Sequence, residues 1–171
     1  MDNGAIFLDY GEIYISNSNF SQNDAKIAGA IFLNSRGSPS LTIEECRFVN
    51  NTAVESGAVS VGGSSTLSIE NSVFIENTAT SQSAALTVNS GPNSRLYNCS
   101  FIENDMSSGR YSVFITADGF IIDSCTFENN TVITDQVLLF SCNNGKILNS
   151  NFTENTAAEG TVTITGSNNL V

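Results

Sequence analysis

Short apolar segments alternate with polar residues along the whole chain, and glycine, asparagine and serine separate one segment from the next. Within a segment, apolar and polar residues follow each other with the period of two that is typical of half-buried β-strands. No segment has an apolar stripe of helical length and spacing. The pattern therefore predicts many short strands joined by tight turns, and almost no helix.

The most regular feature is a phenylalanine followed three residues later by an asparagine. The pair occurs as Phe20/Asn23, Phe48/Asn51, Phe74/Asn77, Phe101/Asn104, Phe127/Asn130 and Phe152/Asn155. Successive phenylalanines are 28, 26, 27, 26 and 25 residues apart. So many copies in one register indicate an internal repeat of one structural unit.

Other positions repeat in the same register. An aliphatic residue lies five positions before each phenylalanine, at Ile15, Ile43, Ile69, Leu96, Ile122 and Ile147. A small residue lies two positions before it, at Ser18, Cys46, Ser72, Cys99, Cys125 and Ser150. The position three before it is usually asparagine, at Asn17, Asn71, Asn98 and Asn149, with Glu45 and Ser124 as exceptions. Upstream lies a second segment, clearest as Gly4-Ala5-Ile6, Gly29-Ala30-Ile31 and Gly57-Ala58-Val59, with weaker copies that begin at Ala84, Tyr111, Gln136 and Gly160.

A unit of 25–28 residues with two or three short strands is too small to bury its own apolar side, so it has to stack on its neighbours. If each unit forms one coil, equivalent strands are parallel and about 4.8 Å apart. Parallel crossovers are right-handed. The sequence therefore predicts an all-β, right-handed, single-stranded parallel β-helix of about 6–7 coils, with residues 1–171 as one segment and Pro39 and Pro92 in the variable connections.

Stacked coils place equivalent side chains in columns. We expect the columns from Ile6 to Val162 and from Ile15 to Ile147 to fill the interior, and the six phenylalanines to form a stack of rings. The six asparagines should bond to one another along the axis, because an amide both donates and accepts. Since asparagine tolerates the left-handed backbone conformation, we also expect this column to form the sharp corners of the coils.

Charge excludes several classes of partner. The chain has 6 Lys and Arg against 17 Asp and Glu, a net charge of -11. Nucleic acids and anionic membrane surfaces are bound by Lys and Arg that neutralise phosphates, so neither partner is expected. No apolar run is long enough to span a bilayer.

The four cysteines, Cys46, Cys99, Cys125 and Cys142, form no CxxC motif, and the chain has no histidine. We therefore expect no zinc site. Three of them alternate with serine in the small-residue column and are expected to fill the core. Cys99 and Cys125 lie in adjacent coils, within reach of a disulfide, but parallel side chains in register are poorly aimed for the bond, so free thiols are favoured.

Five Asn-X-Ser/Thr sequons begin at Asn19, Asn50, Asn98, Asn129 and Asn151. In a protein of a eukaryotic secretory pathway, Asn19, Asn50, Asn129 and Asn151 are possible N-glycosylation sites. A chain rich in asparagine, serine and threonine also forms sequons by chance. Asn98 is disfavoured because its column is expected to point inward or into a turn.

The segments 29–31, 46–53 and 57–59, with the Phe-x-x-Asn pairs, resemble the repeats of chlamydial polymorphic outer-membrane proteins and of pectin-lyase-like β-helix proteins. The resemblance runs from Gly4 to about Ile164. It implies the exposed passenger of a larger surface protein with a role in adhesion. This chain has only one of the two glycines in the family's usual Gly-Gly-Ala-Ile, and the units that begin at Tyr111 and Gln136 have none.

No catalytic constellation is recognisable. Polysaccharide-active β-helix enzymes resemble one another in their clustered aspartates, often with calcium, whereas the aspartates here do not align in adjacent coils. Glycoside hydrolysis needs paired carboxylates, so we expect no catalytic residue, no metal and no cofactor. Acidic residues do align in two columns, for which a solvated acidic face is favoured over a calcium site because no calcium-loop motif is present. The columns are Glu76, Glu103 and Glu154, and Glu44, Glu70 and Asp123.

These observations predict a non-catalytic extracellular or cell-surface scaffold or adhesin segment, which binds through its variable connections or a sheet face. The repeat begins at Gly4 and continues through 161–164 without capping elements, so we expect other copies or adjoining coils of a longer chain as partners. A host or cell-surface protein or a glycan is the other expected partner. The alternative is a fragment of a polysaccharide-active, pectin-lyase-like enzyme.

Overall fold

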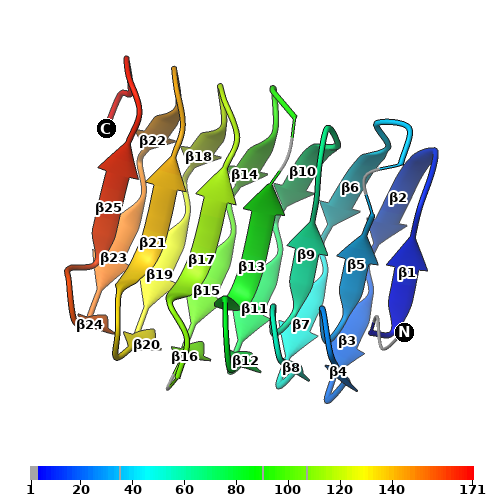
Figure 1. Ribbon diagram of the computed structural model, residues 1–171, viewed down its shortest axis with the longest axis horizontal. Coiled ribbons are helices and arrows are strands. Elements are labelled where there is room, and N and C mark those ends of the chain that lie inside the picture. The colour runs from blue at the N-terminus through cyan, green and yellow to red at the C-terminus, as the bar shows by residue number, and fades with distance from the viewer. Residues whose placement is uncertain (1–3, 35, 90, 107) are drawn as a thin grey trace.

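The computed structural model describes residues 4–34, 36–89, 91–106 and 108–171. It is a right-handed parallel β-helix, in which each coil lies against the next along one axis (Figure 1). The N-terminal and C-terminal coils form the two ends of the stack. Every strand pairing in the described chain is parallel, and no helix occurs there, so the predicted fold class is confirmed.

Four parallel sheets run along the axis, and successive strands of each sheet come from successive coils. Sheet A contains β1 (Ile6–Leu8), β5 (Ile31–Leu33), β9 (Val59–Val61), β13 (Ser83–Asn89), β17 (Tyr111–Thr116), β21 (Gln136–Ser141) and β25 (Val162–Thr165). Sheet B contains β2 (Glu12–Ser16), β6 (Ser40–Glu44), β10 (Thr66–Glu70), β14 (Arg95–Tyr97), β18 (Ile121–Asp123) and β22 (Lys146–Leu148).

Sheet C contains β3 (Asn19–Ser21), β7 (Arg47–Val49), β11 (Val73–Ile75), β15 (Ser100–Ile102), β19 (Thr126–Glu128) and β23 (Asn151–Thr153). Sheet D contains β4 (Asp24–Ala25), β8 (Thr52–Ala53), β12 (Thr78–Ala79), β16 (Asp105–Met106), β20 (Thr131–Val132) and β24 (Thr156–Ala157). A complete coil therefore has four strands, and the expectation of two or three was wrong. The strands of sheet D are two residues long, which is too short for an alternating pattern to reveal them.

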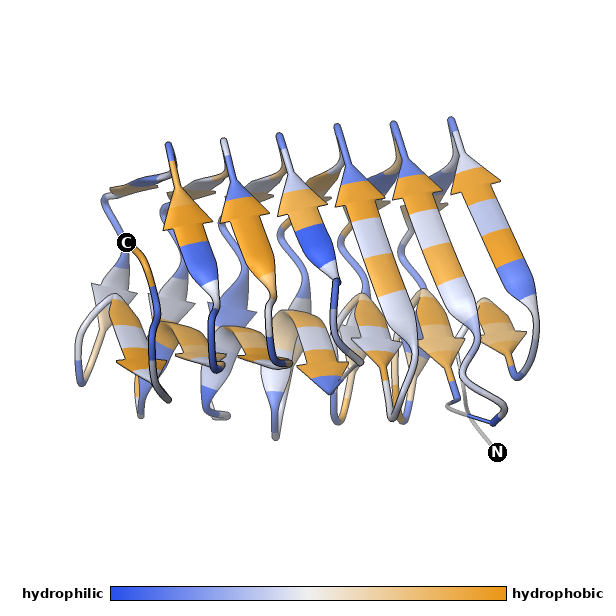
Figure 2. Ribbon diagram, turned by 90° about the horizontal axis from the view of Figure 1, so that it is seen from above, coloured by the Kyte–Doolittle hydropathy of each residue, from blue (hydrophilic) through white to orange (hydrophobic). Residues whose placement is uncertain are grey.

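Equivalent residues of neighbouring coils pair in register, as Ile43 with Ile69 and Phe48 with Phe74. Along the strands, hydrophobic residues alternate with polar ones (Figure 2). The inward residues of sheets A, B and C form one continuous core, in which the central aliphatic and phenylalanine side chains are fully buried. A smaller cluster, which includes Met106, Val132 and Val137, fills the corner between sheets D and A.

Single residues in the left-handed conformation form two corners of every coil. The corner between sheets B and C is Asn17, Glu45, Asn71, Asn98, Ser124 and Asn149, and the corner between sheets C and D is Gln22, Asn50, Glu76, Glu103, Asn129 and Glu154. At the corner between sheets C and D, the positive φ angle belongs to the residue before each asparagine of the Phe-x-x-Asn pair, and none of these six asparagines has one. The prediction that these asparagines form the left-handed corners was therefore wrong. Their side chains instead form hydrogen bonds with one another inside the coil.

The side chains of Asn23, Asn51, Asn77, Asn104, Asn130 and Asn155 form a hydrogen-bonded ladder inside the corner. The backbone N–H and Nδ2 of Asn77 both donate to Oδ1 of Asn104 at 3.0 Å. Nδ2 also donates to the carbonyl oxygen of Phe48 at 3.0 Å. At this corner the backbone groups point away from the sheets into the dry interior, and the amides satisfy them there.

The phenylalanines of the same pairs form a second column. Successive ring centroids lie 5.1, 4.6, 4.8, 4.9 and 4.6 Å apart from Phe20 to Phe152, with interplanar angles of 5 to 12°. The short centroid distances follow from the coil spacing, since in-register strands are about 4.8 Å apart. The regular column of rings ties each coil to both of its neighbours.

The glycine of the Gly-Ala-Ile segment is needed because coils approach closely at this corner. A Cβ atom on Gly57 would lie 1.9 Å from the carbonyl oxygen of Ala84, and one on Gly29 would lie 2.2 Å from that of Gly57. Between Ser83 and Leu86 the pairing of β13 with β17 shifts register. The glycine is absent from the copies that begin at Ala84, Tyr111 and Gln136, which lie at this shift and beyond it.

Candidate functional site

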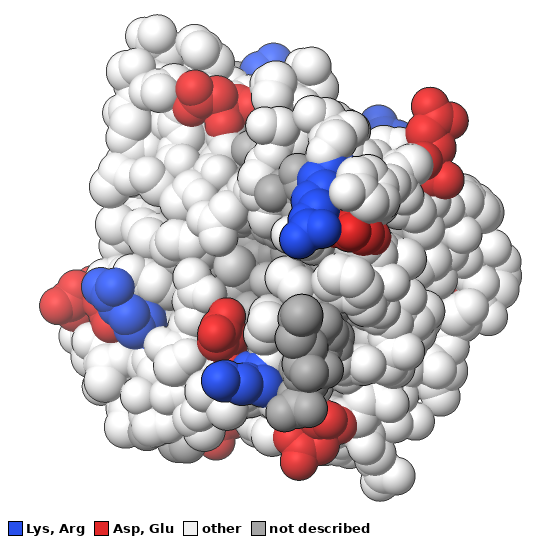
Figure 3. Space-filling model, turned by 45° about the vertical axis from the view of Figure 1, so that its right-hand side comes forward, with Lys and Arg blue, Asp and Glu red and all other residues white. Residues whose placement is uncertain are grey.

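Outward side chains differ from coil to coil, in contrast to the repeated interior. On the face shown in Figure 3, acidic and basic side chains are dispersed over a mostly uncharged surface. The paired glutamates of sheet B have side-chain partners, because the Tyr14 hydroxyl donates to Glu44 and Arg95 forms an ion pair with Glu70. The Arg95 guanidinium lowers the pKa of Glu70. Like-charge repulsion on this face is therefore relieved by protein side chains.

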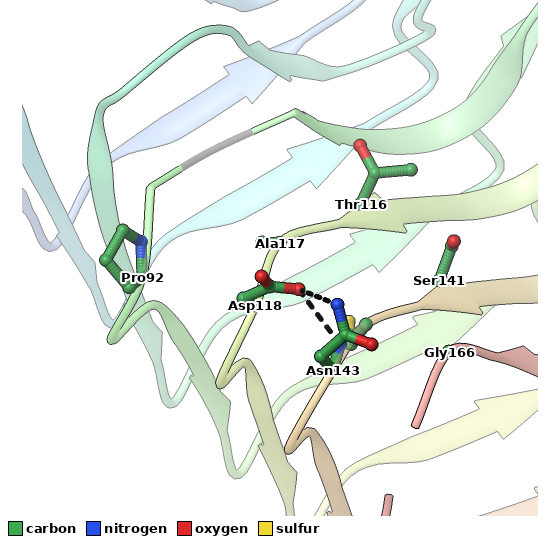
Figure 4. Close-up of a pocket in the computed structure, with 8 residues that line it drawn as sticks. Pro92, Thr116, Ala117, Asp118, Ser141, Asn143 and Gly166 are labelled. Carbon is green, nitrogen blue, oxygen red and sulfur yellow. Dashed lines mark hydrogen bonds between the residues drawn. The ribbon is translucent and has the colours of Figure 1, made fainter. Parts of the chain in front are cut away.

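A cavity of about 450 Å³ opens on the outer face at the ends of the sheet A strands (Figure 4). We call it the outer cavity. Its walls include Thr116, Asp118, Ser141, Asn143 and Gly166, with Pro92 facing them from the loop between β13 and β14. Ala117 and Cys142 complete its lining. The cavity thus draws on coils four to seven, and the connection of the fourth coil forms one of its sides.

Two rows of side chains follow the axis beside the outer cavity. Thr116 and Ser141 are direct partners in sheet A, and Thr165 continues the row. Two residues earlier on the same face, Phe114 pairs with Leu139, and both are partly exposed. In-register pairing places members of each row about 4.8 Å apart. Two apolar side chains, in the fifth and sixth coils, therefore lie beside the row of hydroxyl groups, and Thr163 takes the same position in the seventh coil.

Asp118 and Asn143 form the polar side of the outer cavity. Oδ1 of Asp118 accepts hydrogen bonds from the backbone N–H of Asn143 at 2.9 Å and from its Nδ2 at 3.0 Å. Oδ1 of Asn143 accepts in turn from the Ser167 hydroxyl at 2.9 Å. Within the described chain, the structure shows no hydrogen-bond partner for Oδ2 of Asp118 or for the Ser141 hydroxyl. Both groups can therefore bond to a ligand.

No sequence motif pointed to these residues. Thr116, Ser141 and Asn143 belong to no family pattern, and the aspartates were considered only as a possible column of carboxylates. The usable signal was indirect: Pro92 lay in a variable connection, and the weaker copies of the Gly-Ala-Ile segment fell in the coils that line the outer cavity. A second cavity of about 420 Å³, lined by Asp24, Ala25, Lys26 and Val54, lies near sheet D.

The four cysteines are free and buried. Burial raises the pKa of Cys46, and it raises that of Cys142 to about 11. The neighbouring Cys125 side chain and burial together raise the pKa of Cys99. The small-residue column has the same hydrogen-bond pattern whether its member is serine or cysteine, since Ser72 donates to the carbonyl of Glu70 and Cys99 to that of Tyr97.

We expect the thiols of the folded protein to resist an aromatic disulfide reagent at pH 8. With a pKa of about 11 for Cys142, only about one molecule in a thousand carries the reactive thiolate there at that pH, and burial blocks the reagent. Since the folded pKa is raised, the reaction at Cys142 should accelerate as the pH rises toward 11. The released chromophore should report four thiols after unfolding in denaturant. Fast labelling of the folded chain, or an intact mass lower by two hydrogens before reduction, would contradict this expectation.

The asparagines of all five sequons lie exposed on the surface. Asn50 and Asn129 occupy left-handed corners between sheets C and D, and Asn19 and Asn151 lie in strands of sheet C. Asn98 is also at a left-handed corner, where its Nδ2 donates to Oδ1 of Asn71 at 2.8 Å. The column that contains Asn98 therefore turns the chain and points outward. The side-chain amide of Asn98, which glycosylation would modify, is already hydrogen-bonded to Asn71. The use of these sequons stays a prediction.

The described residues show neither a cluster of metal ligands nor a membrane-spanning helix. Three or more acidic, cysteine or histidine side chains never gather there in a way that could hold a metal ion. No helix of membrane-spanning length and hydropathy is found in that part of the chain.

Comparison with known proteins gives one match, to the fold. The family described as "right handed beta helix region" matches residues 2–107, which is more than half of the chain. Neither a curated protein nor a solved structure matches it significantly. The family match covers more than half of the chain, and its stacked parallel sheets have the architecture that the family's description names. The chain therefore belongs to the right-handed β-helix family.

Proposed function

We propose that this chain is a non-catalytic segment of an extracellular or cell-surface scaffold, which holds a partner against the outer face of sheet A. The observation that carries the proposal is the contrast between the two faces of each coil. The inward side chains repeat along the axis, whereas the outward ones vary and enclose the outer cavity. A rigid frame that presents variable positions at its connections is the usual arrangement of a binding protein.

The chemistry of the outer cavity supports holding a ligand over cleaving one. Its ionisable lining residues in the described chain are Asp118 and the buried Cys142. One oxygen of Asp118 is bonded to the backbone and side-chain N–H groups of Asn143, and the other faces no described partner. Glycoside cleavage uses two carboxylates on either side of the bond, one of them protonated. The outer cavity pairs its carboxylate with hydroxyl and amide groups, which suit recognition.

The repeats support a place on the cell surface. Their Phe-x-x-Asn pairs and Gly-Ala-Ile segments resemble the passenger repeats of polymorphic outer-membrane proteins, which are surface-exposed and implicated in adhesion. The uncharged, hydroxyl-rich outer face and the low content of Lys and Arg suit contact with proteins or glycans. Adjoining coils of a longer chain would extend the same face.

Incubation with polygalacturonate and with neutral polysaccharides, each with and without Ca²⁺, should release no new reducing ends and no unsaturated products. Reducing-sugar assays and ultraviolet absorbance measure the two outcomes. Antibodies against the chain should label intact cells of the source without permeabilisation. Robust turnover would replace the scaffold with a polysaccharide-active enzyme, and labelling only after permeabilisation would exclude a surface location.

A further inference from the structure

We infer that the outer cavity binds a neutral, linear glycan whose chain runs along the axis of the β-helix, a ligand class that rests on the binding role proposed above. Two features point to this class: the hydroxyl groups of the outer cavity repeat at the coil spacing, and the apolar side chains of Phe114 and Leu139 lie beside them, two residues earlier along the same strands.

The repeat along the axis suits a polymer. Thr116 and Ser141 are in-register neighbours, and so are Phe114 and Leu139 beside them. Each of these two coils therefore offers one hydroxyl and one apolar contact, about 4.8 Å apart along the axis, and the coils on either side carry Thr87 and Thr163 at the apolar position. That spacing is close to the length of one pyranose ring in an extended chain. The lining residues come from four successive coils, so the cavity extends roughly 14 Å along the axis, which accommodates about three rings.

The two rows match the two kinds of surface on a sugar ring. A pyranose has apolar C–H faces and hydroxyl groups at its edge. The face can lie on Phe114 and Leu139, which are partly exposed on the outer face of sheet A. The edge hydroxyls then reach the Ser141 hydroxyl and Oδ2 of Asp118, the two polar groups without a described partner.

Charge decides between neutral and acidic glycans. A ligand carboxylate or sulfate would come close to Asp118, in a protein with a net charge of -11, and the described lining holds no Lys or Arg to offset the repulsion. A sugar hydroxyl, in contrast, donates a charge-assisted hydrogen bond to the same carboxylate. The outer cavity therefore selects against uronic acid polymers and nucleic acids.

Isothermal titration of the full chain with cellohexaose, xylohexaose and mannohexaose tests the inference, with hexagalacturonate as the acidic arm. At least one neutral hexasaccharide should bind, with an affinity that does not change between 50 mM and 500 mM salt. Asp118→Asn should weaken it at least about tenfold, because one charge-assisted hydrogen bond is lost. Ser141→Ala should weaken it less. Thr126→Ala, which removes a hydroxyl from the outer face of sheet C, should leave it unchanged.

Backbone amide shifts provide a second readout that does not depend on the variants. Addition of the bound hexasaccharide should shift the signals of 114–118 and 139–143, and not those of sheet C. The inference fails if none of the neutral hexasaccharides binds, or if Asp118→Asn and Thr126→Ala bind alike. A protein partner found on an array in the absence of glycan binding would overturn the glycan inference and leave the scaffold proposal standing. Cleavage of a hexasaccharide would overturn the non-catalytic proposal instead.

Discussion

Replacement of Asn77 by alanine is expected to lower the free energy of unfolding by about 4 kcal/mol, since several buried polar groups lose their partners at once. Asn77 is fully buried in the middle of the ladder. Its Oδ1 accepts from the backbone N–H and Nδ2 of Asn51, and its Nδ2 donates to Phe48 and Asn104. Alanine removes all these bonds and leaves a small cavity beside the phenylalanine stack.

Denaturant unfolding followed by circular dichroism measures the change, with two matched variants. Asn151→Ala removes an exposed asparagine and should change stability by less than about 0.5 kcal/mol. Asn23→Ala removes a partly buried member at the end of the described ladder, which bonds to Asn51 alone, and should cost about 1 kcal/mol. If Asn77→Ala proved as mild as Asn151→Ala, the ladder would not be a major source of stability.

Gly57→Ala is expected to cost about 3 kcal/mol, although it adds only one methyl group. The new Cβ would lie 1.9 Å from the carbonyl oxygen of Ala84 and 2.6 Å from that of Thr78. Both obstacles are backbone atoms of the fourth and third coils, so no side-chain rotation relieves the overlap. The corner between sheets D and A has to open, which weakens the hydrogen bond from Gly57 N–H to the Ser83 carbonyl.

Gly62→Ala is the matched control, because the nearest atom to its new Cβ is the Leu33 carbonyl oxygen at 3.8 Å, an ordinary contact. It should change the free energy of unfolding by less than about 0.5 kcal/mol. Thermal and denaturant midpoints of the two variants provide the comparison. Equal midpoints would show that the corner yields easily and that the repeated glycine has another cause. Failure of Gly57→Ala alone to fold would support the close approach of the coils.

The columns of stacked side chains are predictable from the sequence repeat alone. Once Phe48 and Phe74 were known to occupy equivalent places, the spacing of parallel strands required their rings to stack. Direct bonding between Asn51 and Asn77 followed from the two-sided chemistry of the amide. These are contacts between equivalent residues of neighbouring coils, which a solenoid places at one fixed distance. The register of the repeat in the sequence therefore predicts which residues are in contact.

The sequence alone determined the fold class, the coil, the interior columns and the expectation of buried thiols, because each depends on what repeats. Only the tertiary structure decided which residue turns each corner, since Glu76 and Asn77 differ in backbone conformation for reasons of hydrogen bonding inside the coil. It alone also brought Pro92, Asp118 and Ser141 around one cavity, because these three residues are not equivalent positions of the repeat. Connections are the parts of the coil that do not repeat, and their paths are set by packing that no periodic pattern encodes.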